Sequence, residues 1–487
     1  MLDKPREYDL IVIGSGAGLN VASSAYSRGM KVAILDDGPL GGTCLNRGCI
    51  PTKIILYPAE VVETLRDAGK IGVTASDVKV NFKLVMRRMH DLVDGDVGEM
   101  TKGIEAAEGL DFFNSAGRFV SEKVIEVKGK KITAPLILIA AGSREFIPPI
   151  PGLEEVGYID STSVLELKDP PKSLMIMGGG YIAAEFGHFF AAVGTKVRII
   201  GRNRYLVKQE EPEISEELRR RLSGRMKVHT GMEAVEAGID EKGKYIIARD
   251  SGTGKRYRYH AEEIMVAAGR VSNADLFNPE AAGVKTDRNG WVIVDKYLRT
   301  NVPGIWAIGD AIGRNMFRHT ANYESEVAWN NMNAESEEEM TELDEHAVPH
   351  AVFTHPEIAS VGMREEEAVK KHLVTVGEAM YTDAIKGYAM GEDTSFVKVI
   401  VSAKTGRILG AHAIGPHATA MVQPLVYLMN SGKGTYTPLA RAQTIHPAME
   451  EIMVRAFGNM RPGRGQEEHF GGHHHHHSHD HDHDHSH

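Results

Sequence analysis

The sequence predicts an α/β protein in which one strand–turn–helix–strand plan is used twice. Its 487 residues are too many for a single core, and at about 150 residues per domain they allow roughly three domains. Hydrophobic residues make up 42% and charged residues 25% of the chain, a balance typical of folded globular proteins. Strands that alternate with helices favour parallel sheets with helices on their faces.

The first repeat begins with the apolar strand 8–13, which leads directly into Gly14 and Gly16. Glycines without side chains let backbone N–H groups approach a pyrophosphate at the positive end of the following helix. The second strand of this repeat ends at Asp36, and a carboxylate there favours an adenosine with a free 2′-OH. Leu19 stands where a third glycine would help the helix pack on the strand, so we expect this helix slightly farther away.

The second repeat has strand 174–177, the turn glycines Gly178 and Gly180, and a second strand that ends without an acidic residue. Arg202 and Arg204 follow that strand instead. Cations in place of a carboxylate suit a 2′-phosphate, which favours NADPH over NADH. The alternative is that these arginines are solvated surface charges, and NADH therefore stays open.

Each repeat closes with a strand that runs into a glycine, Gly142 in the first and Gly269 in the second. A single glycine turn is a weak signal, because many such turns bind nothing. Two copies in the same strand–turn–helix context indicate two bound dinucleotides. We therefore predict two Rossmann-like dinucleotide-binding domains.

The overall charge and the apolar pattern exclude several classes of partner. The formal net charge of −10 does not favour a nucleic acid or an anionic membrane surface. No apolar run reaches the roughly 18 residues that a membrane span needs. The charged start of the sequence runs straight into a strand, so we expect no signal peptide and a cytoplasmic protein.

Only two cysteines, Cys44 and Cys49, occur in the chain. Two thiols cannot form a four-thiolate zinc or iron–sulfur site, and they do not resemble the disulfide framework of a secreted domain. By themselves they are either inert thiols or a redox couple. They lie in the run 41–53, Gly-Gly-Thr-Cys-Leu-Asn-Arg-Gly-Cys-Ile-Pro-Thr-Lys, where a helix start and a nearby lysine would lower a thiol pKa.

This run, together with the two glycine turns, resembles the class I pyridine nucleotide–disulfide oxidoreductases, the family of dihydrolipoamide dehydrogenase, glutathione reductase, mycothione reductase and mercuric reductase. The resemblance extends from Tyr8 to Asn459. It implies that the first dinucleotide is FAD and the second is NADPH or NADH. It also implies that Cys49 contacts the flavin as the charge-transfer thiol, that Cys44 exchanges with substrate, and that Lys53 lies beside the reactive flavin nitrogen.

The resemblance extends to further cofactor positions. The segment 300–310 is similar to the family motif whose aspartate, here Asp310, hydrogen-bonds the ribityl chain of FAD. His319 and Ala321 are then expected at the start of a helix that faces the pyrimidine end of the flavin. Glu185, in the helix after the second glycine turn, is also expected to contribute to cofactor binding.

His446 and Glu451 are similar to the family's His-Pro-x-x-x-Glu element. A departing thiolate must be protonated, and histidine is the side chain whose pKa lies near neutrality. The glutamate would orient the imidazole and stabilise its cation. In the family this pair reaches into the active site of the partner subunit, so the resemblance implies a homodimer.

The motifs also predict the domain organisation. The expected parts are an FAD domain in 1–149 and 270–332, an NAD(P) domain in 150–269, an acidic linker in 333–348, an α+β dimerisation domain in 349–460 and a disordered His-rich tail in 461–487. From His473 the chain has five histidines and then alternates histidine with aspartate, so it is either an expression tag or, as the alternation favours, a native segment whose side chains suit divalent metals. We expect no catalytic metal.

The sequence thus predicts an FAD-dependent NAD(P)H:disulfide oxidoreductase that interconverts a small disulfide and its dithiol. A dihydrolipoamide dehydrogenase-like reaction and the NADPH-dependent reduction of a low-molecular-weight disulfide, as in mycothione or glutathione reductase, both stay open. The lack of a second cysteine pair near the carboxyl end disfavours a mercuric reductase. A metal-binding protein whose flavin fold is ancillary to its His-rich tail is the alternative from another class.

Overall fold

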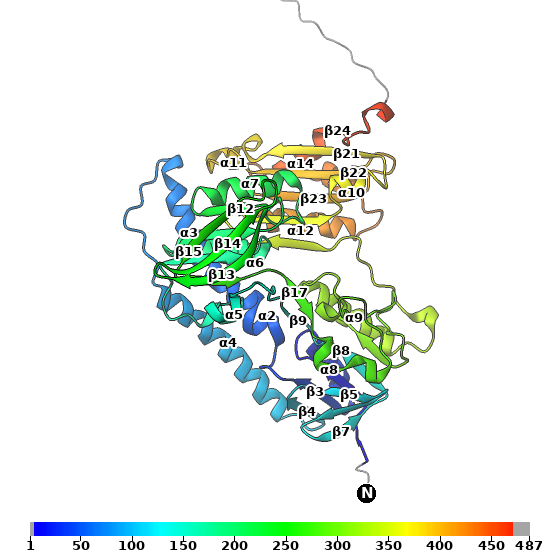
Figure 1. The fold of residues 1–487 in the computed structure, drawn as a ribbon. Coiled ribbons are helices and arrows are strands. Elements are labelled where there is room, and N and C mark those ends of the chain that lie inside the picture. The colour runs from blue at the N-terminus through cyan, green and yellow to red at the C-terminus, as the bar shows by residue number, and fades with distance from the viewer. Residues whose placement is uncertain (1–3, 471–487) are drawn as a thin grey trace, which may run out of the picture. The chain divides into compact units, whose positions relative to one another are not determined.

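The computed structural model describes residues 4–470, and the chain divides into two compact units. The first unit is formed mainly by the chain up to Ala359 and the second mainly by the chain from Ser360. Figure 1 labels their helices and strands. Between residues 4 and 470, no helix is both long and apolar enough to cross a membrane.

A five-stranded parallel sheet in the first unit carries the first glycine turn. Its strands, with two of the helices that pack beside them, are β2 Leu10–Ile13, β3 Val32–Asp36, β4 Leu110–Asn114, β8 Leu136–Ile139, β18 Ile305–Ala307, α1 Gly18–Ser27 and α9 Arg318–Met332. The strand order is β18-β8-β2-β3-β4, so a strand from far along the chain completes the sheet. All four residues of β2 are buried, as expected for a parallel sheet that is covered on both faces.

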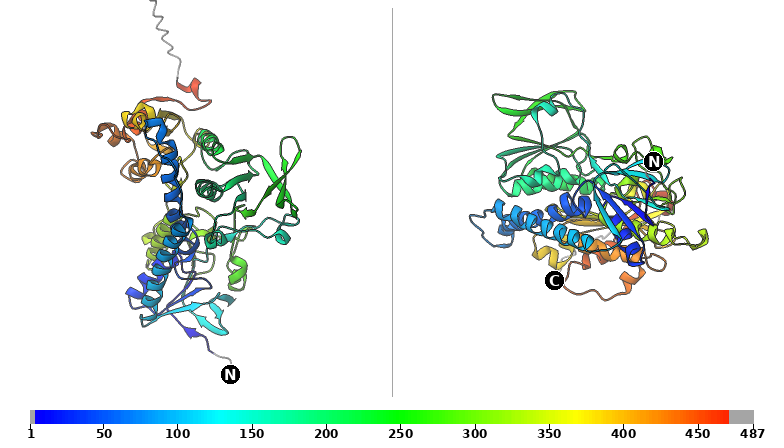
Figure 2. Two further views of the ribbon diagram at one scale, coloured as in Figure 1. Left: turned by 90° about the vertical axis from the view of Figure 1, so that its left-hand side faces the viewer. Right: turned by 90° about the horizontal axis from the view of Figure 1, so that it is seen from below.

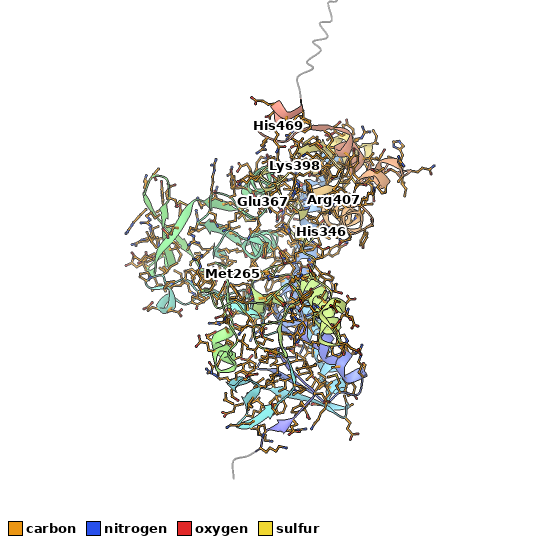
Figure 3. The ribbon with its side chains drawn as sticks, turned by 90° about the vertical axis from the view of Figure 1, so that its right-hand side faces the viewer. Met265, His346, Glu367, Lys398, Arg407 and His469 are labelled. Atoms are coloured by element: carbon orange, nitrogen blue, oxygen red, sulfur yellow. The ribbon has the colours of Figure 1, made fainter. Side chains whose placement is uncertain are left out.

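A second parallel sheet carries the second glycine turn. Its strands and helices are β10 Ser173–Met177, β11 Lys196–Gly201, β12 Lys227–Thr230, β16 Glu263–Val266, α6 Tyr181–Ala192 and α7 Pro212–Ser223. The strand order is β12-β11-β10-β16, and Met265 of β16 is fully buried (Figure 3). Helix α6 is buried from Ala183 to its end, because its residues are nearly all small or aromatic.

Three smaller sheets complete the first unit. They are β1 Arg6–Glu7 with β5 Arg118–Ser121, β6 Val124–Val127 and β7 Lys130–Thr133; β13 Met232–Asp240 with β14 Gly243–Asp250 and β15 Arg256–Ala261; and β9 Ser143–Glu145 with β17 Arg270–Ser272. The β9–β17 pair matters for the site, because it aligns the segment after Gly142 with the segment after Gly269. In its antiparallel register Ser143 lies opposite Ser272.

The cysteine motif forms two consecutive helices, α2 Gly42–Arg47 and α3 Cys49–Asp67. Helix α4, Phe82–Glu105, runs beside α3 in both views of Figure 2. Helix α3 also packs against α6, so the cysteine motif lies next to the second repeat. Two short helices follow along the chain, α5 Leu153–Val156 and α8 Ala274–Phe277.

The acidic segment 333–348, expected as a solvated linker, is attached to the first unit by ion pairs. Arg299 Nη1 lies 3.0 Å from a carboxylate oxygen of Glu337, and Lys296 pairs with Glu342. The N–H of Leu343 donates to the carbonyl of Lys296. The negative charges of this segment are therefore partly neutralised by cations of the preceding loop.

The second unit has an α+β arrangement. Its elements, with the two strands that precede or enter it, are β19 Pro349–Val352, β20 Ile358–Gly362, α10 Glu365–Ala368, β21 Val374–Met380, α11 Ile385–Ala389, β22 Phe396–Ser402, β23 Ile408–Ile414, α12 Ala418–Met429, α13 Thr437–Arg441, α14 Glu451–Gly458 and β24 Met460–Pro462. Strand β21 pairs antiparallel with both β22 and β24. Helix α14 packs on β21 and β22.

The prediction of disorder from residue 461 onward differs from the structure. Pro462 pairs with Thr375 in the β24–β21 ladder. The side chain of Gln466 accepts from the N–H of Val374 and donates to the carbonyl of Val369. Residues 461–470 are therefore held by the pairing of β24 with β21 and by the hydrogen bonds of Gln466 to the backbone of Val374 and Val369. The His-rich segment lies outside the described residues.

Candidate active site

The two cysteines lie on consecutive helices that meet at Gly48. Cys44 belongs to α2, and Cys49 is the first residue of α3. A Cβ at Gly48 would lie 2.9 Å from the carbonyl oxygen of Thr43, so only glycine fits this junction without movement. The junction brings the two thiols close enough for each to shift the pKa of the other, and both side chains are half-buried.

The environment makes the two thiols unequal. A hydrogen bond from Cys44, the positive charge of Lys53 and the N–H at the start of α3 lower the pKa of Cys49 to about 7. The hydrogen bond to Cys49 and burial raise the pKa of Cys44. Cys49 is therefore the thiol that ionises first, and Cys44 holds its proton.

Lys53 lies one helical turn after Cys49 and joins the two repeats. Its Nζ lies 2.9 Å from Oε2 of Glu185 on α6. Oε1 of Glu185 accepts from the N–H of Phe353 at 2.9 Å, and Lys53 Nζ lies 4.5 Å from the centre of the Phe353 ring. The structure thus brings together two predicted cofactor residues that are far apart in sequence, and it adds Phe353, which no sequence signal indicated.

The first glycine turn has the shape that a pyrophosphate requires. Gly14 has φ +102°, and a Cβ there would lie 2.1 Å from the carbonyl oxygen of Ala140. The next glycine, Gly16, faces open space, where a Cβ would meet only a nitrogen of Arg318 at 3.9 Å. This cradle fits the pyrophosphate of FAD, since phosphate oxygens can approach the backbone closely there.

Asp36 stabilises the first turn from the end of β3. Its Oδ2 accepts from the N–H and the hydroxyl of Ser15 at 2.7 and 2.6 Å, and its Oδ1 accepts from the N–H of Gly38. The carboxylate therefore fixes the turn, and its contact with ribose stays a prediction.

The second glycine turn has the same geometry. Gly178 has φ +144°, and a Cβ there would lie 2.1 Å from the carbonyl oxygen of Ala267. Gly180 has no atom within 4 Å of a Cβ position, so the turn is open to a ligand. Arg202 and Arg204 are exposed beyond the end of β11, where they are accessible to the 2′-phosphate of NADPH. The turn therefore fits NAD(P)H.

Gly142 and Gly269 follow the closing strands at equivalent places. Both have positive φ, +67° and +131°, and neither has an atom within 4 Å of a Cβ position. Each strand end therefore stays open beside its glycine turn.

Asp310 belongs to a polar network that the sequence did not indicate. The hydroxyl of Ser143 donates to its Oδ2 at 2.5 Å, and Arg270 Nε donates to the same hydroxyl at 2.6 Å. Arg270 also lies 3.6 Å from Asp310 Oδ2. The β9–β17 pair places Ser143 and Arg270 here, and pairing between strands so far apart in sequence leaves no local signal.

Glu324 lies beneath this loop and is fully buried on α9. Its Oε2 accepts from the N–H of Gly309 at 2.6 Å. Its Oε1 is buried without a hydrogen-bond partner in the described part of the chain. Burial raises the pKa of Glu324 to about 7.

The predicted helix at the flavin begins one residue earlier than expected, at Arg318. The ring of His319 stacks on Phe317 at 5.5 Å, its Nε2 lies 2.7 Å from the carbonyl oxygen of Pro349, and burial lowers its pKa. The N–H of Ala321 donates to the carbonyl of Phe317 inside the helix, so it is not available to a ligand. Arg318, which the sequence interpretation passed over, is the charged residue at this end.

His446 and Glu451 form a pair within the second unit. Nδ1 of His446 lies 2.9 Å from Oε1 of Glu451, whose Oε2 accepts from the N–H of Ala448. These contacts lower the pKa of Glu451, first through His446. The carboxylate thus orients the imidazole and leaves Nε2 as the nitrogen that Glu451 does not engage.

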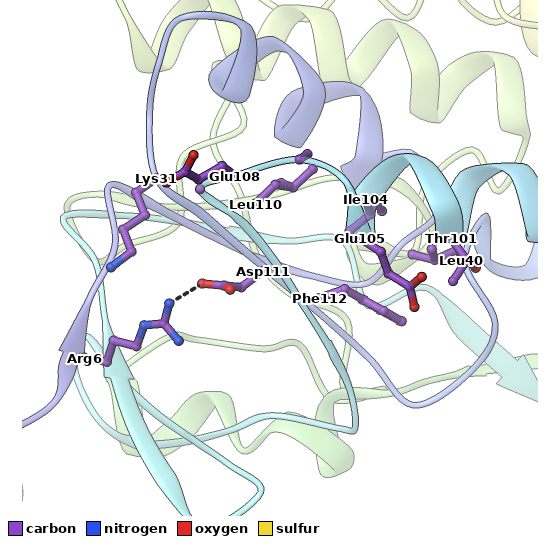
Figure 4. Close-up of a pocket in the computed structure, with 12 residues that line it drawn as sticks. Arg6, Lys31, Leu40, Thr101, Ile104, Glu105, Glu108, Leu110, Asp111 and Phe112 are labelled. Atoms are coloured by element: carbon purple, nitrogen blue, oxygen red, sulfur yellow. Dashed lines mark hydrogen bonds and ion pairs between the residues drawn. The ribbon is translucent and has the colours of Figure 1, made fainter.

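The structure was also searched for a metal site and for pockets apart from these residues. Within residues 4–470, no group of three or more His, Cys, Asp or Glu side chains could hold a metal ion. A pocket of about 630 Å³ beside β4, with an ion pair of 2.6 Å between Arg6 and Asp111, contains none of the predicted site residues (Figure 4). This pocket therefore does not contribute to the cysteine site.

Comparison with known proteins identifies the family of the chain. The family model for pyridine nucleotide-disulphide oxidoreductases matches residues 8–325, and the model for their dimerisation domain matches residues 348–457. The match to the dimerisation domain supports a homodimer.

Similar proteins cover nearly the whole chain. A mycothione reductase of Mycobacterium tuberculosis is 36% identical over 465 residues, which span 93% of this chain and 99% of that protein. A dihydrolipoyl dehydrogenase of Chlamydia trachomatis is 32% identical over 456 residues, which span 92% and 96%. The structure of the HOCl-induced flavoprotein disulfide reductase RclA from Escherichia coli matches with a TM-score of 0.81 at 26% identity, over 93% of this chain and 99% of that one. The chain therefore belongs to the pyridine nucleotide-disulphide oxidoreductase family, whose members of this kind use FAD and NAD(P)H.

Proposed function

We propose that Cys44 and Cys49 of this FAD-dependent NAD(P)H:disulfide oxidoreductase interconvert a small disulfide and its dithiol. The observation that carries this proposal is the meeting of two half-buried thiols at the Gly48 junction, one helical turn before Lys53. Cys49, with a pKa of about 7, is about half ionised at neutral pH, and the positive charge of Lys53 favours its thiolate. Cys44 keeps its proton until a base removes it, as an interchange thiol should.

The residues of this chain can carry out the exchange in two steps. Bound FAD would supply a path for two electrons from NAD(P)H to the Cys44–Cys49 disulfide. Once reduced and deprotonated, Cys44 attacks one sulfur of the substrate disulfide, a mixed disulfide forms, and the departing thiolate takes a proton. Cys49 then attacks the sulfur of Cys44, which restores the internal disulfide and releases the second thiol. One disulfide, one NAD(P)H and one proton thus give two thiols and NAD(P)⁺.

We assign the proton transfer to His446, oriented by Glu451. Support comes from the hydrogen bond of 2.9 Å, which holds Nδ1 and leaves Nε2 to exchange a proton with a sulfur. In this proposal the pair serves the cysteines of the partner subunit in the homodimer.

We propose NADPH as the electron donor. Arg202 and Arg204 are exposed after β11, and Gly201 stands where the first repeat has Asp36. A carboxylate at that place would repel a 2′-phosphate, whereas the two guanidinium groups attract one.

We also place the enzyme in the cytoplasm, where a reducing environment suits a chain whose only cysteines are a redox pair. The segment from His473 is proposed as a divalent-metal ligand separate from catalysis. A chain shortened by residues 472–487 should keep its turnover and lose metal binding.

Steady-state turnover across a small matrix tests the function. NADPH or NADH is paired with lipoamide, glutathione disulfide or mycothione disulfide, and dihydrolipoamide with NAD⁺ is assayed in reverse. Turnover with at least one pair, abolished in both C44S and C49S, supports the proposal. Turnover that survives in both variants would refute a role for the pair, and fast dihydrolipoamide oxidation by NAD⁺ would refute the preference for NADPH.

A further inference from the structure

Arg318 is a half-buried cation whose partner is missing from the described part of the chain. It is the first residue of α9, and its guanidinium donates no hydrogen bond to, and forms no ion pair with, any residue between 4 and 470. A half-buried guanidinium has five N–H donors to satisfy. None of these nitrogens is a buried atom without a partner, so they are accessible from solvent, and an unpaired guanidinium there favours an anion.

The position of the guanidinium indicates which anion that is. Nη1 of Arg318 lies 3.9 Å from the place where Gly16 would carry a Cβ. That place is the open side of the first glycine turn, where the missing side chain leaves room for a phosphate oxygen. Gly42 packs against another side of Gly16, since a Cβ at Gly42 would lie 2.8 Å from the Cα of Gly16, so a phosphate has no room on that side.

The same guanidinium also acts on the cysteine pair. Its positive charge favours ionisation of both thiols, although the hydrogen bond between Cys44 and Cys49 has the larger influence on their pKa values. The charge of Arg318 is therefore felt at both the glycine turn and the dithiol, which are its two candidate partners. The geometry favours the turn, because a direct approach to Gly16 is observed and no contact of Arg318 with a sulfur is.

We propose that Arg318 binds the pyrophosphate of FAD and so links the start of α9 to the first glycine turn. A guanidinium matches two phosphate oxygens through parallel N–H···O bonds, which a lysine can replace only as a point charge. This inference rests on the use of FAD by the family and is independent of the substrate.

Titration of the apoprotein with FAD, followed by quenching of flavin fluorescence, tests the proposal. R318Q keeps much of the length and polarity of the side chain but removes its charge, and R318K keeps the charge. We expect the Kd for FAD to rise by about tenfold or more in R318Q. R318K should recover part of that loss.

R314A provides a matched control, because Arg314 lies four residues away and pairs with Glu345 at 3.2 Å. Its Kd for FAD should equal that of the wild type. Wild-type affinity in R318Q would overturn the proposal, as would equal losses in R318Q and R318K, which would indicate shape rather than charge.

A second readout separates the two candidate partners. The ultraviolet absorbance of the Cys49 thiolate is followed against pH in the same apoproteins. A shifted thiolate titration with unchanged FAD affinity would assign Arg318 to the thiols and refute the phosphate contact. If the wild-type apoprotein itself failed to bind FAD, the proposed function would be refuted. If only R318Q bound FAD as tightly as the wild type, the role of Arg318 alone would be refuted.

Discussion

Replacing Glu324 by glutamine should stabilise the protein in a pH-dependent way. The carboxyl group is fully buried, one of its oxygens lacks a partner in the described chain, and burial raises its pKa to about 7 from an ordinary 4.5. A folded-state pKa above the unfolded value means that the favourable contribution is fully present below about pH 4.5 and is lost as the pH rises through about 7. The wild type should therefore lose stability over this interval.

The expected size follows from the two pKa values. The difference corresponds to about 3 kcal/mol at about 1.4 kcal/mol per pH unit. Glutamine resembles the neutral carboxyl group at every pH and still accepts from the N–H of Gly309 through its amide oxygen. E324Q should thus be close to the wild type in stability near pH 4 and more stable by up to about 3 kcal/mol near pH 8.

Denaturant unfolding of the FAD-loaded proteins at these two pH values measures the effect. E326Q is the matched control, because Glu326 lies on the same helix but is exposed. It should show no gain that grows with pH. A gain for E324Q that is equal at both pH values would refute the reasoning, since it would mean that the carboxyl group does not titrate between them.

Three further predictions concern the reaction. Removing the thiol that donates to Cys49, in C44A, should move the thiolate titration of Cys49 upward from about 7 toward its ordinary value of 9.0, and an unchanged midpoint would contradict the hydrogen-bond account. Replacing Arg202 and Arg204 together by alanine should raise KM for NADPH by about tenfold or more and leave KM for NADH unchanged, and equal effects on the two would argue against a phosphate site. H446Q should lower disulfide turnover by roughly a hundredfold or more while reduction of the flavin by NAD(P)H keeps its rate, and a slowed flavin reduction would contradict a role limited to thiol protonation.

The sequence predicted well those features whose physics is local. A glycine turn requires positive φ and close backbone approach within a few residues, so Gly14 and Gly178 could be recognised directly. The run around Cys44 and Cys49 could be recognised in the same way, and Cys49 begins helix α3 at the expected helix start, whereas Cys44 lies on a separate short helix. The prediction of disorder was wrong for residues 461–470, because the pairing of Pro462 with Thr375 depends on a strand far away in the chain.

The partners of the site residues were decided by tertiary structure. Lys53 contacts Glu185 across 132 positions of sequence, and no local sequence pattern predicts that these two residues pair. Arg270 and Ser143 reach Asp310 only because β17 pairs with β9. The burial that perturbs Glu324 likewise depends on the packing of the whole sheet. Sequence alone therefore determined the turns and the redox pair, since backbone conformation is set by near neighbours, whereas charge pairing and burial depend on segments that only the fold brings together.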